Sequence, residues 1–436
     1  MKVLSRFFVP AMALLLAACG GGGAAAPASS APPASPASAK PAASSPAAAA
    51  PASAAAKPSA SSAANAAGNP IKIGIMAEFT GPFGANGIRI ADTLEWLSQQ
   101  DGGMMAGRPV KFIRTEDQGK VDIFQSEGKR LIDSEKVDLI VGPINSGVAS
   151  SAQKWMNDQP TTWVIYEVGT VQYYPGDNAV RSVATSWHVA LPALGKYYAD
   201  QGIKRAFTIG LDYAAGRDYV NGEAQKVLPA GNIQLAKQFW VPVGNADFGP
   251  IISQIPAGQD VLITGALWSA DAGRFMQQAT DFGLKSKVKL ISFPAAFAND
   301  DDDPKALAEG AGMDVYNEMP PPDYPNADYQ KFVTAFKQKY GVPPGYATKA
   351  YLTYLQIKQA AEALKGDLSD RKKLMDTLRQ PLKTTFGTIN FDKCGNAVRS
   401  IFLKQIKATG GLGGTSMVQE FGDSSIPCPQ PAEWKG

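Results

Sequence analysis

Beyond residue 70, the chain alternates between short stretches in which every second residue is apolar and longer stretches in which apolar residues recur every three or four positions. The first short stretch is IKIGIM at 71–76, and the first long stretch places Ile90, Leu94 and Leu97 on one side before Gly102. A period of two is typical of a half-buried β-strand, and a period near 3.6 is typical of an amphipathic helix. This region therefore predicts a strand followed by a helix.

The same pair of patterns recurs along the chain in two series. The first series predicts strands near Val110–Arg114, Leu139–Val141 and Thr162–Tyr166, and helices near Ile123–Ser134 and from Ser146. The second series predicts strands near Ala206–Gly210, Gln238–Val241, Val261–Thr264 and Lys289–Ser292, and helices near Tyr219–Leu228 and Asp271–Phe282. Strands and helices that alternate with short connections predict parallel sheets covered by helices on both faces. The predicted fold class is therefore α/β, with two doubly wound parallel-sheet lobes.

The last part of the chain predicts a different order of elements. Three long helical patterns lie near Asp328–Tyr340, Thr348–Lys365 and Asp370–Arg379. A hairpin follows, with TINFD at 388–392 as one strand, Cys394–Asn396 as the turn and Ser400–Ile406 as the return strand. GGLGGTS at 410–416 is interpreted as a flexible loop, because no strand and helix surround it as they surround a phosphate-binding loop.

The N-terminus has the pattern of an export signal. Two basic residues precede an apolar run from Phe7 to Leu16, which is shorter than the roughly 20 residues that a helix needs to cross a bilayer. LAAC at 16–19 resembles the lipobox of bacterial lipoproteins. The resemblance implies that residues 1–18 are removed as a signal peptide and that Cys19 is acylated and anchors the protein to a membrane. An ordinary signal peptide with an incidental cysteine is the alternative, and the choice between inner and outer membrane stays open.

The segment after the signal is of low complexity. Residues 20–70 are almost entirely Ala, Pro, Ser and Gly. They offer too little apolar bulk to offset the entropy lost on ordering, so we expect residues 19–70 to form a disordered tether.

Charge and length describe the remaining chain. Four of the 42 Lys and Arg residues and none of the 39 Asp and Glu residues lie in the first 70 positions, so the remainder is near neutral. This balance argues against a nucleic-acid partner. The remainder is also longer than one hydrophobic core usually supports, which agrees with two lobes.

The clearest candidate site lies in LIVGPINSGVASSAQKW at 139–155. In open parallel sheets, ligands bind beyond the carboxyl ends of the strands. Here a buried strand is followed by Asn145, Ser146 and Gly147 at the start of a helix, where free N–H groups and the serine hydroxyl can bind a carboxylate. The alternative is that Asn145 or Ser146 only caps the helix.

The sequence offers little for catalysis or metal binding. His188 is the single histidine, and no Cys or carboxylate partner stands at the spacing of a zinc site. The motifs G-x-S-x-G, P-loop and H-E-x-x-H are absent. NDDDDPK at 299–305 lacks the spacing of an EF-hand and is interpreted as a solvated acidic loop rather than a Ca²⁺ site. We therefore predict no enzyme activity, no cofactor and no metal, and place His188 at a hinge or at the rim of a cleft.

Five segments carry a resemblance to a known family. They are IKIGIMAEFTGPFGANG (71–87), VGPINSGV (141–148), DYAAGRDY (212–219), GALWSADAGRFMQQATDFGL (265–284) and GTINFDKCGNAVRSIFLKQIK (387–407). In this order, over the region from Pro70 to about Ala408, they resemble the Leu/Ile/Val-binding family of type I periplasmic binding proteins, the solute receptors of ABC importers.

The resemblance implies a domain organisation. Two lobes are joined by three crossovers, and they close on a ligand. The expected crossovers lie near Val183–Trp187, Val315–Glu318 and Thr385–Asn390. The first lobe is then 71–184 plus 317–386, and the second lobe is 187–315 plus 389–432.

The resemblance also implies which residues line the ligand site. Ser146 and Thr170 fall at positions that hold a ligand carboxylate, together with nearby backbone amides, among which we expect those of Asn145, Gly147 and Gly169. The positions that bind an ammonium group in the family have lost their acids, which are replaced here by Trp187 and by Ala295 or Ala296. Tyrosines of the family site are replaced here by Asn86, Ala215 and Trp268.

These replacements predict the class of ligand. A buried ammonium group without a nearby anion would cost several kcal/mol, which argues against a plain amino acid. We expect a small organic carboxylate with an apolar or aromatic body, which contacts Trp187 and Trp268 and has four further aromatic residues near it: Phe79, Phe83, Tyr166 and Phe297. Each aromatic residue could instead belong to a core. An amino acid, an amide or a betaine also stays open as the ligand. Asp212 or Asp271 would then balance the positive charge of a cationic group.

The expected partners follow from this reading. They are a small-molecule ligand and an ABC-transporter permease in the inner membrane, and the protein is expected to be a monomer anchored by lipid in the periplasm. A ligand-sensing or cell-envelope regulatory lipoprotein on the same scaffold is the alternative. In an exported protein, the remaining pair Cys394 and Cys428 is predicted to form a disulfide that pins the C-terminal tail, the alternative being two buried thiols.

Overall fold

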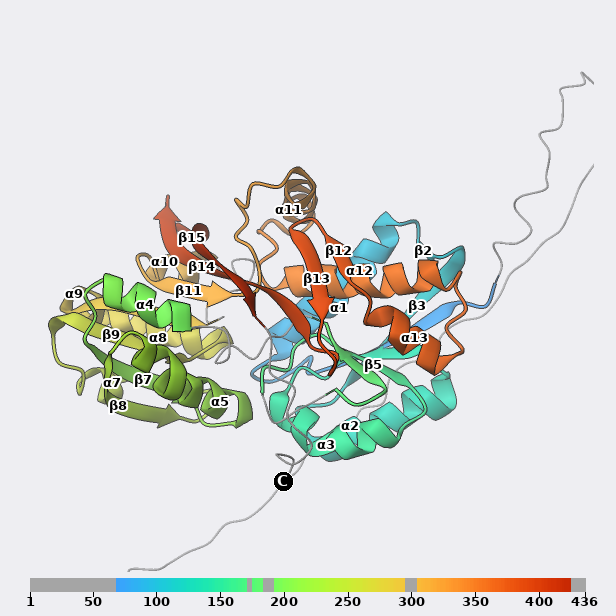
Figure 1. Cartoon of the computed structure of the whole chain (residues 1–436), viewed down its shortest axis with the longest axis horizontal. Coiled ribbons are helices and arrows are strands. Elements are labelled where there is room, and N and C mark those ends of the chain that lie inside the picture. Colours follow the sequence, from blue (N-terminus) through green and yellow to red (C-terminus); the bar gives the residue numbers. More distant parts are fainter. Residues whose placement is uncertain (1–67, 171–174, 183–191, 295–303, 425–436) are drawn as a thin grey trace, which may run out of the picture. The chain divides into compact units, whose positions relative to one another are not determined.

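The computed structural model describes residues 68–170, 175–182, 192–294 and 304–424. These ranges contain two β-sheets, each with helices on both faces, which we call the first and the second lobe (Figure 1). Within the same ranges, no helix is both long enough and apolar enough to span a membrane. Several predictions of the sequence fall outside the described residues: the signal peptide with Cys19, nearly all of the tether, Trp187, His188, Ala295, Ala296, Phe297, the acidic segment up to Asp303, and Cys428.

The first lobe is built on a six-stranded sheet with the order β2-β3-β1-β4-β5-β6. Its strands are β1 (Ile71–Ala77), β2 (Met104–Met105), β3 (Arg108–Glu116), β4 (Leu139–Val141), β5 (Thr162–Ile165) and β6 (Ala179–Arg181). All neighbours are parallel except the short β2, which is antiparallel to β3. Its helical elements are α1 (Gly84–Gln100), α2 (Val121–Arg130), the π-helical turn η1 (Leu131–Glu135), α3 (Ser146–Asp158), α11 (Ala327–Tyr340), α12 (Ala347–Ala363) and α13 (Arg371–Leu378).

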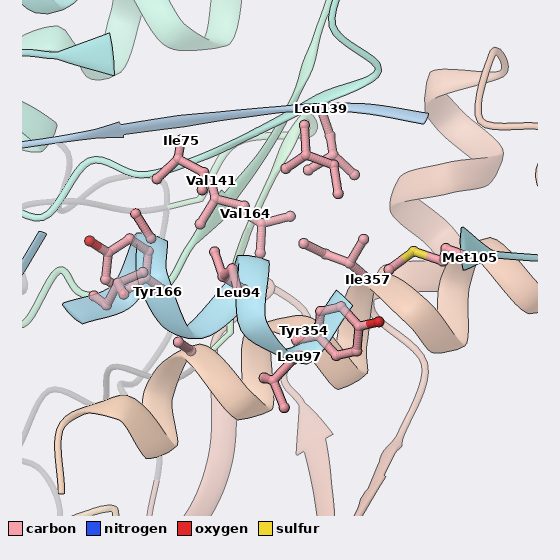
Figure 2. Packing of buried hydrophobic residues seen from close by; sticks show 14 of the residues in the cluster. Ile75, Leu94, Leu97, Met105, Leu139, Val141, Val164, Tyr166, Tyr354 and Ile357 are labelled. Carbon is pink, nitrogen blue, oxygen red and sulfur yellow. The ribbon is translucent and has the colours of Figure 1, made fainter. Parts of the chain in front are cut away.

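Two apolar layers hold this sheet. On one face, residues of β1, β4 and β5 pack against α1, α11, α12 and α13, as Figure 2 shows for Val141, Leu94 and Ile357. On the other face, Ile140 and Trp163 pack against α2 and α3. Because both faces of β4 and β5 are buried, these two strands are apolar almost throughout, as is usual for parallel sheets.

Local sequence signals set the ends of the helices. Asn326 caps α11, since its side chain accepts hydrogen bonds from the N–H groups of Asp328 and Tyr329, each at 3.0 Å. Gly341 ends the same helix in the left-handed region with a φ of 79°, which glycine adopts without steric cost. These two residues account for the agreement between the predicted helix and α11.

The second lobe is built on a nine-stranded sheet with the order β12-β13-β14-β11-β10-β9-β7-β8, in which β15 also pairs with β14. The strands β7 (Arg205–Leu211), β8 (Gln234–Val241), β9 (Gly258–Ala266), β10 (Val288–Pro294) and β11 (Asp314–Asn317) are mutually parallel. The strands β12 (Leu382–Thr384), β13 (Gly387–Phe391), β14 (Ala397–Thr409) and β15 (Leu412–Ser424) are antiparallel. The parallel part is thus extended by an antiparallel ribbon.

Helices again cover both faces of this sheet. One face packs against α7 (Gly249–Ile252), α8 (Ser269–Asp281), α9 (Leu284–Lys287) and α10 (Pro304–Glu309). The other face packs against α4 (Pro192–Asp200), α5 (Ala214–Gly222), the π-helical turn η3 (Glu223–Val227) and α6 (Leu228–Ala230). The predicted class, two α/β lobes with parallel sheets between helices, is confirmed.

The glycine-rich segment 410–416 is not the flexible loop that we predicted. Gly410 and Gly411 form the turn of a hairpin, both with positive φ, and residues 412–416 belong to β15, which pairs with β14 along its length. Glycine weakens a strand on its own, so the local pattern points to a loop. The pairing with β14, whose own pattern is strongly apolar, overrides that preference.

The segment that contains the predicted third connection packs against both lobes. Leu382, Ile389 and Ala397 pack with Leu352 of α12 in the first lobe. Ile401 packs in the core of the second lobe, and Phe402 of the same strand pairs with β11. Strand β14 therefore contacts both cores along its length. The position of the third connection and the exact lobe boundaries stay predictions.

A buried carboxyl group in the second lobe makes stability depend on pH. Glu223 is 2% exposed, accepts hydrogen bonds from Thr264 and Tyr316, and has a pKa that burial raises to about 7. The folded state therefore holds this proton more tightly than the unfolded chain, and the free energy of unfolding falls as pH rises from about 4.5 to about 7. In Glu223→Gln, we expect that loss to shrink by about 3 kcal/mol. Urea unfolding of both proteins at pH 4.5 and pH 8 measures how much the free energy of unfolding changes between the two pH values. An equal change in the two proteins would contradict the prediction.

Candidate functional site

The topology of the first sheet fixes where a ligand site can form. The chain passes from β1 to β3 on one side and then crosses to β4 on the other side of β1. Ligands of doubly wound folds bind at such a reversal, beyond the carboxyl ends of the strands. The loops that follow β1 and β4 therefore define the candidate site, and α3 starts within it.

The start of α3 combines a helix cap with a free hydroxyl. The side chain of Asn145 accepts hydrogen bonds from the N–H groups of Gly147 at 2.9 Å and Val148 at 3.3 Å. Ser146 is 4% exposed, and its hydroxyl has no hydrogen bond to any of the described residues. Asn145 is thus the cap, and Ser146 is the residue that keeps a donor available beside the helix N-terminus.

Two acids lie close to this helix start, and sequence analysis missed both. The amide of Asn145 donates to Glu78 at 2.9 Å, and burial raises the pKa of Glu78. Asp117 follows β3, is fully buried and accepts the N–H of Gly119 at 2.9 Å; burial raises its pKa to about 6. Each acid directly follows a strand, and the carboxyl ends of parallel strands lie at the same edge of the sheet. This position is the only feature of the sequence that could have identified them as candidate site residues.

Thr170 meets the second lobe. Both Gly169 and Thr170 are buried, and the Thr170 hydroxyl donates to the carboxylate of Asp218 on α5. The structure thus brings an acid of the second lobe to a predicted carboxylate-binding residue. Asp218 lies in the segment DYAAGRDY, where no pattern in the sequence indicates a role for it.

Aromatic residues gather near the start of α3, since the backbone of Phe83 and the side chain of Asn145 both hydrogen-bond to Glu78. Trp268, directly before α8, contacts Tyr213 and Tyr219 edge to face, with ring centroids 5.7 Å and 5.3 Å apart. Tyr213 also lies 6.1 Å from Phe83, which directly precedes α1 of the first lobe. We call these four residues the aromatic cluster. Trp268 and Phe83 were predicted; Tyr213 and Tyr219 were missed, although both lie in the quoted segment DYAAGRDY.

The other predicted positions are distributed around this cluster. Asn86 is buried in the first turn of α1, and Ala215 is buried in α5. Tyr166 is fully buried in the apolar core of the first lobe, so its ring serves packing (Figure 2). Phe79 is half-buried against the same core.

The acids considered for a cationic ligand are already engaged. Asp212 is paired with Arg217, whose Nε lies 2.6 Å from its carboxylate. Asp271 accepts the N–H of Gly244 at 2.9 Å and forms an ion pair with Arg274. Neither carboxylate is therefore left without a partner to balance a ligand ammonium group.

The cysteines and metal ligands add two facts. Cys394 is disulfide-bonded, and its partner lies outside the described residues, so the pairing with Cys428 stays a prediction. Among the residues that the structure describes, no cluster of three or more His, Cys, Asp and Glu side chains could hold a metal ion.

Comparisons with known proteins agree with this architecture. The model of the periplasmic binding protein family matches residues 70–411. The Leu/Ile/Val-binding protein homolog 6 of Brucella abortus (strain 2308) is 24% identical over 259 residues, which cover 58% of this chain and 64% of that protein. The chain thus matches less than two thirds of the length of this curated relative.

Solved structures show the same fold. The solute-binding protein of an ABC transporter from R. palustris, in complex with benzoate, has a TM-score of 0.73 and 22% identity, and the match covers 82% of this chain and 98% of that one. A solute-binding protein from Rhodopseudomonas palustris BisB5, in complex with 3,4-dihydroxybenzoic acid, has a TM-score of 0.73 and 21% identity, with 82% and 99% covered. This chain belongs to the periplasmic binding protein family, in its type I, Leu/Ile/Val-binding group.

Proposed function

We propose that this protein is the extracytoplasmic solute-binding component of an ABC importer, and that it binds a small organic carboxylate with an apolar or aromatic body. The observation that carries the proposal is the aromatic cluster, to which both lobes contribute, and it is supported by the Ser146 hydroxyl at the N-terminus of α3. The helix N-terminus favours an anion, and the rings favour a flat apolar body. The benzoate and dihydroxybenzoate complexes of the R. palustris proteins support the same class of ligand.

Each residue has a role in this proposal. Ser146, Thr170 and the amide of Gly169 bind the carboxylate, while Asn145 accepts the N–H of Gly147 and holds the helix start in place. The ring-binding residues are the aromatic cluster, Asn86 at its edge, and Trp187. Asp212 is paired with Arg217 and would contribute only indirectly.

A panel of small acids tests the proposal. Isothermal titration calorimetry of the purified protein with benzoate, 3-phenylpropionate, 3,4-dihydroxybenzoate, leucine and phenylalanine separates the classes. We expect at least one of benzoate, 3-phenylpropionate and 3,4-dihydroxybenzoate to bind with micromolar or tighter affinity. If none of these three acids binds, the proposal is wrong.

A second candidate ligand is an amino acid, and one observation favours it. Asp218 lies against Thr170 and could balance an ammonium group next to the carboxylate. Phenylalanine and 3-phenylpropionate differ only by that amino group. Under the leading proposal, 3-phenylpropionate binds at least as tightly; a preference of a hundredfold or more for phenylalanine, lost in Asp218→Asn, would establish the second candidate.

Membrane attachment belongs to the same proposal. If Cys19 carries the acyl chains, the tether keeps a mobile receptor near the permease without restricting the lobes. In Cys19→Ser, we expect the protein to move from the membrane fraction to the soluble fraction, because the anchor is lost. Immunoblots of fractionated cells measure this, and a variant that stays in the membrane fraction contradicts the anchor.

A further inference from the structure

A buried lysine connects the candidate ligand segment to the connections between the lobes. Lys349 lies in the first turn of α12 and is 1% exposed. Its ammonium group forms an ion pair with the carboxylate of Glu167 and lies 3.0 Å from Glu318 Oε1. Glu318 is fully buried, and the side chain of Glu167 is 22% exposed.

The two acids belong to different functional parts of the chain. Glu167 lies three residues before Thr170, on the segment that follows β5 and carries the predicted carboxylate ligands. Glu318 directly follows β11 of the second sheet, at the predicted second connection. Arg399 of β14 donates to the backbone carbonyl of Glu318. Lys349 therefore joins the ligand segment to the predicted second connection, and Arg399 joins β14 to the same residue.

The electrostatics show that the ammonium group is charged. Burial acts to lower the pKa of Lys349, but the charges of Glu167 and Glu318 outweigh it, and the net direction is upward. The stability of a buried, charged lysine depends on both of its partners, because removal of one partner leaves a buried charge uncompensated. The arrangement is therefore one of fixed distances rather than a loose surface pair.

We infer that Lys349 is a positioning residue for ligand binding, a role that rests on the proposed function. It holds residues 166–170 in one arrangement relative to Glu318, so that the backbone of Gly169 and Thr170 keeps its place at the ligand site. Through the same contacts, a ligand bound at Thr170 would stabilise the arrangement of the residues at the predicted second connection. Preorganised donors bind more tightly because the cost of ordering them is met before the ligand arrives.

The test replaces Lys349 with methionine, which keeps most of the chain length and removes the charge. Hydrogen–deuterium exchange of the ligand-free protein is expected to rise at least tenfold at residues 166–170, relative to the β1 amides at 71–77. Benzoate is expected to bind at least tenfold more weakly by calorimetry. The melting temperature, measured in parallel, reports any general loss of stability.

A matched control comes from the same helix. Lys358→Met also removes a lysine of α12, one that pairs with Asp101 at 2.6 Å, and should leave exchange at 166–170 and benzoate affinity unchanged. Glu167→Gln is the second variant if Lys349→Met does not fold, and should raise exchange at the same residues. Unchanged exchange there in a folded variant, with only a lower melting temperature, would overturn the inference. If the unmodified protein binds none of the acids, the proposed function fails, whereas exchange in the ligand-free protein still decides whether Lys349 orders this segment.

Discussion

Replacing Ser146 with aspartate is expected to weaken benzoate binding at least a hundredfold while the protein stays folded. The serine hydroxyl is the donor that has no described partner at the start of α3, so a carboxylate there would meet the ligand carboxylate directly. Like charges in contact at a binding site cost several kcal/mol, and about 3 kcal/mol corresponds to the expected loss. The helix dipole favours an acid in the first turn and offsets part of the cost of burying this charge near Glu78, so we expect the variant to fold with a lower melting temperature.

Two further variants identify the cause of the loss. Ser151→Asp places the same charge on the exposed face of α3 and is expected to leave the affinity within threefold. Ser146→Ala removes only the hydrogen bond and is expected to cost about 1 to 2 kcal/mol. Calorimetry with benzoate, with circular dichroism as a check of folding, gives all three values. Benzoate affinity that survives in Ser146→Asp would place the carboxylate elsewhere.

The two buried acids near Asn145 bear on the same site. Glu78 and Asp117 would repel a ligand carboxylate if both were ionised. Burial raises the pKa of both carboxyl groups, that of Asp117 to about 6, so about half of the Asp117 charge is absent at pH 6. The amide of Asn145 lies between Glu78 and the helix start, since it donates to Glu78 while its oxygen faces the helix. An anion can therefore bind near these acids, because burial raises their pKa values and because the amide of Asn145 hydrogen-bonds to Glu78.

The sequence predicted the parts of the fold that depend on local patterns. The strand at 71–76 and the helix that contains Ile90, Leu94 and Leu97 follow from periodicity, because burial of one face imposes it. Strand β15 was missed because its glycines have no local preference for a strand, and its pairing with β14 is decided by the tertiary structure.

The site divides in the same way. Asn145 and Ser146 are readable from the sequence, because a cap and the helix that it begins are neighbours in the chain. The contacts of Thr170 with Asp218 and of Lys349 with Glu167 join residues 48 and 182 positions apart. No local pattern marks such pairs. Trp268 was found only through the family resemblance, and its partners Tyr213 and Tyr219 emerged only from the structure.

Replacing Trp268 with alanine is expected to weaken binding of benzoate by about 2 to 4 kcal/mol. The indole is half-buried and contacts Tyr213 and Tyr219 edge to face, so it presents a fixed surface to a ligand ring. Buried tryptophans at the centre of binding sites often carry this much of the binding free energy. The side chain makes no capping hydrogen bond to α8, so its removal should leave that helix intact.

The size of this effect separates a ligand contact from a core contact. Trp240, in β8, lies under the guanidinium group of Arg217 at 5.0 Å and has no place in the proposed site, so Trp240→Phe serves as the control. If Trp268 faces the ligand, Trp268→Ala lowers affinity for benzoate far more than it lowers the free energy of unfolding, and Trp268→Phe restores part of the affinity. If Trp268 only packs, the free energy of unfolding falls and calorimetry finds the affinity unchanged in both variants, because a core residue acts on the folded state as a whole and not on the ligand.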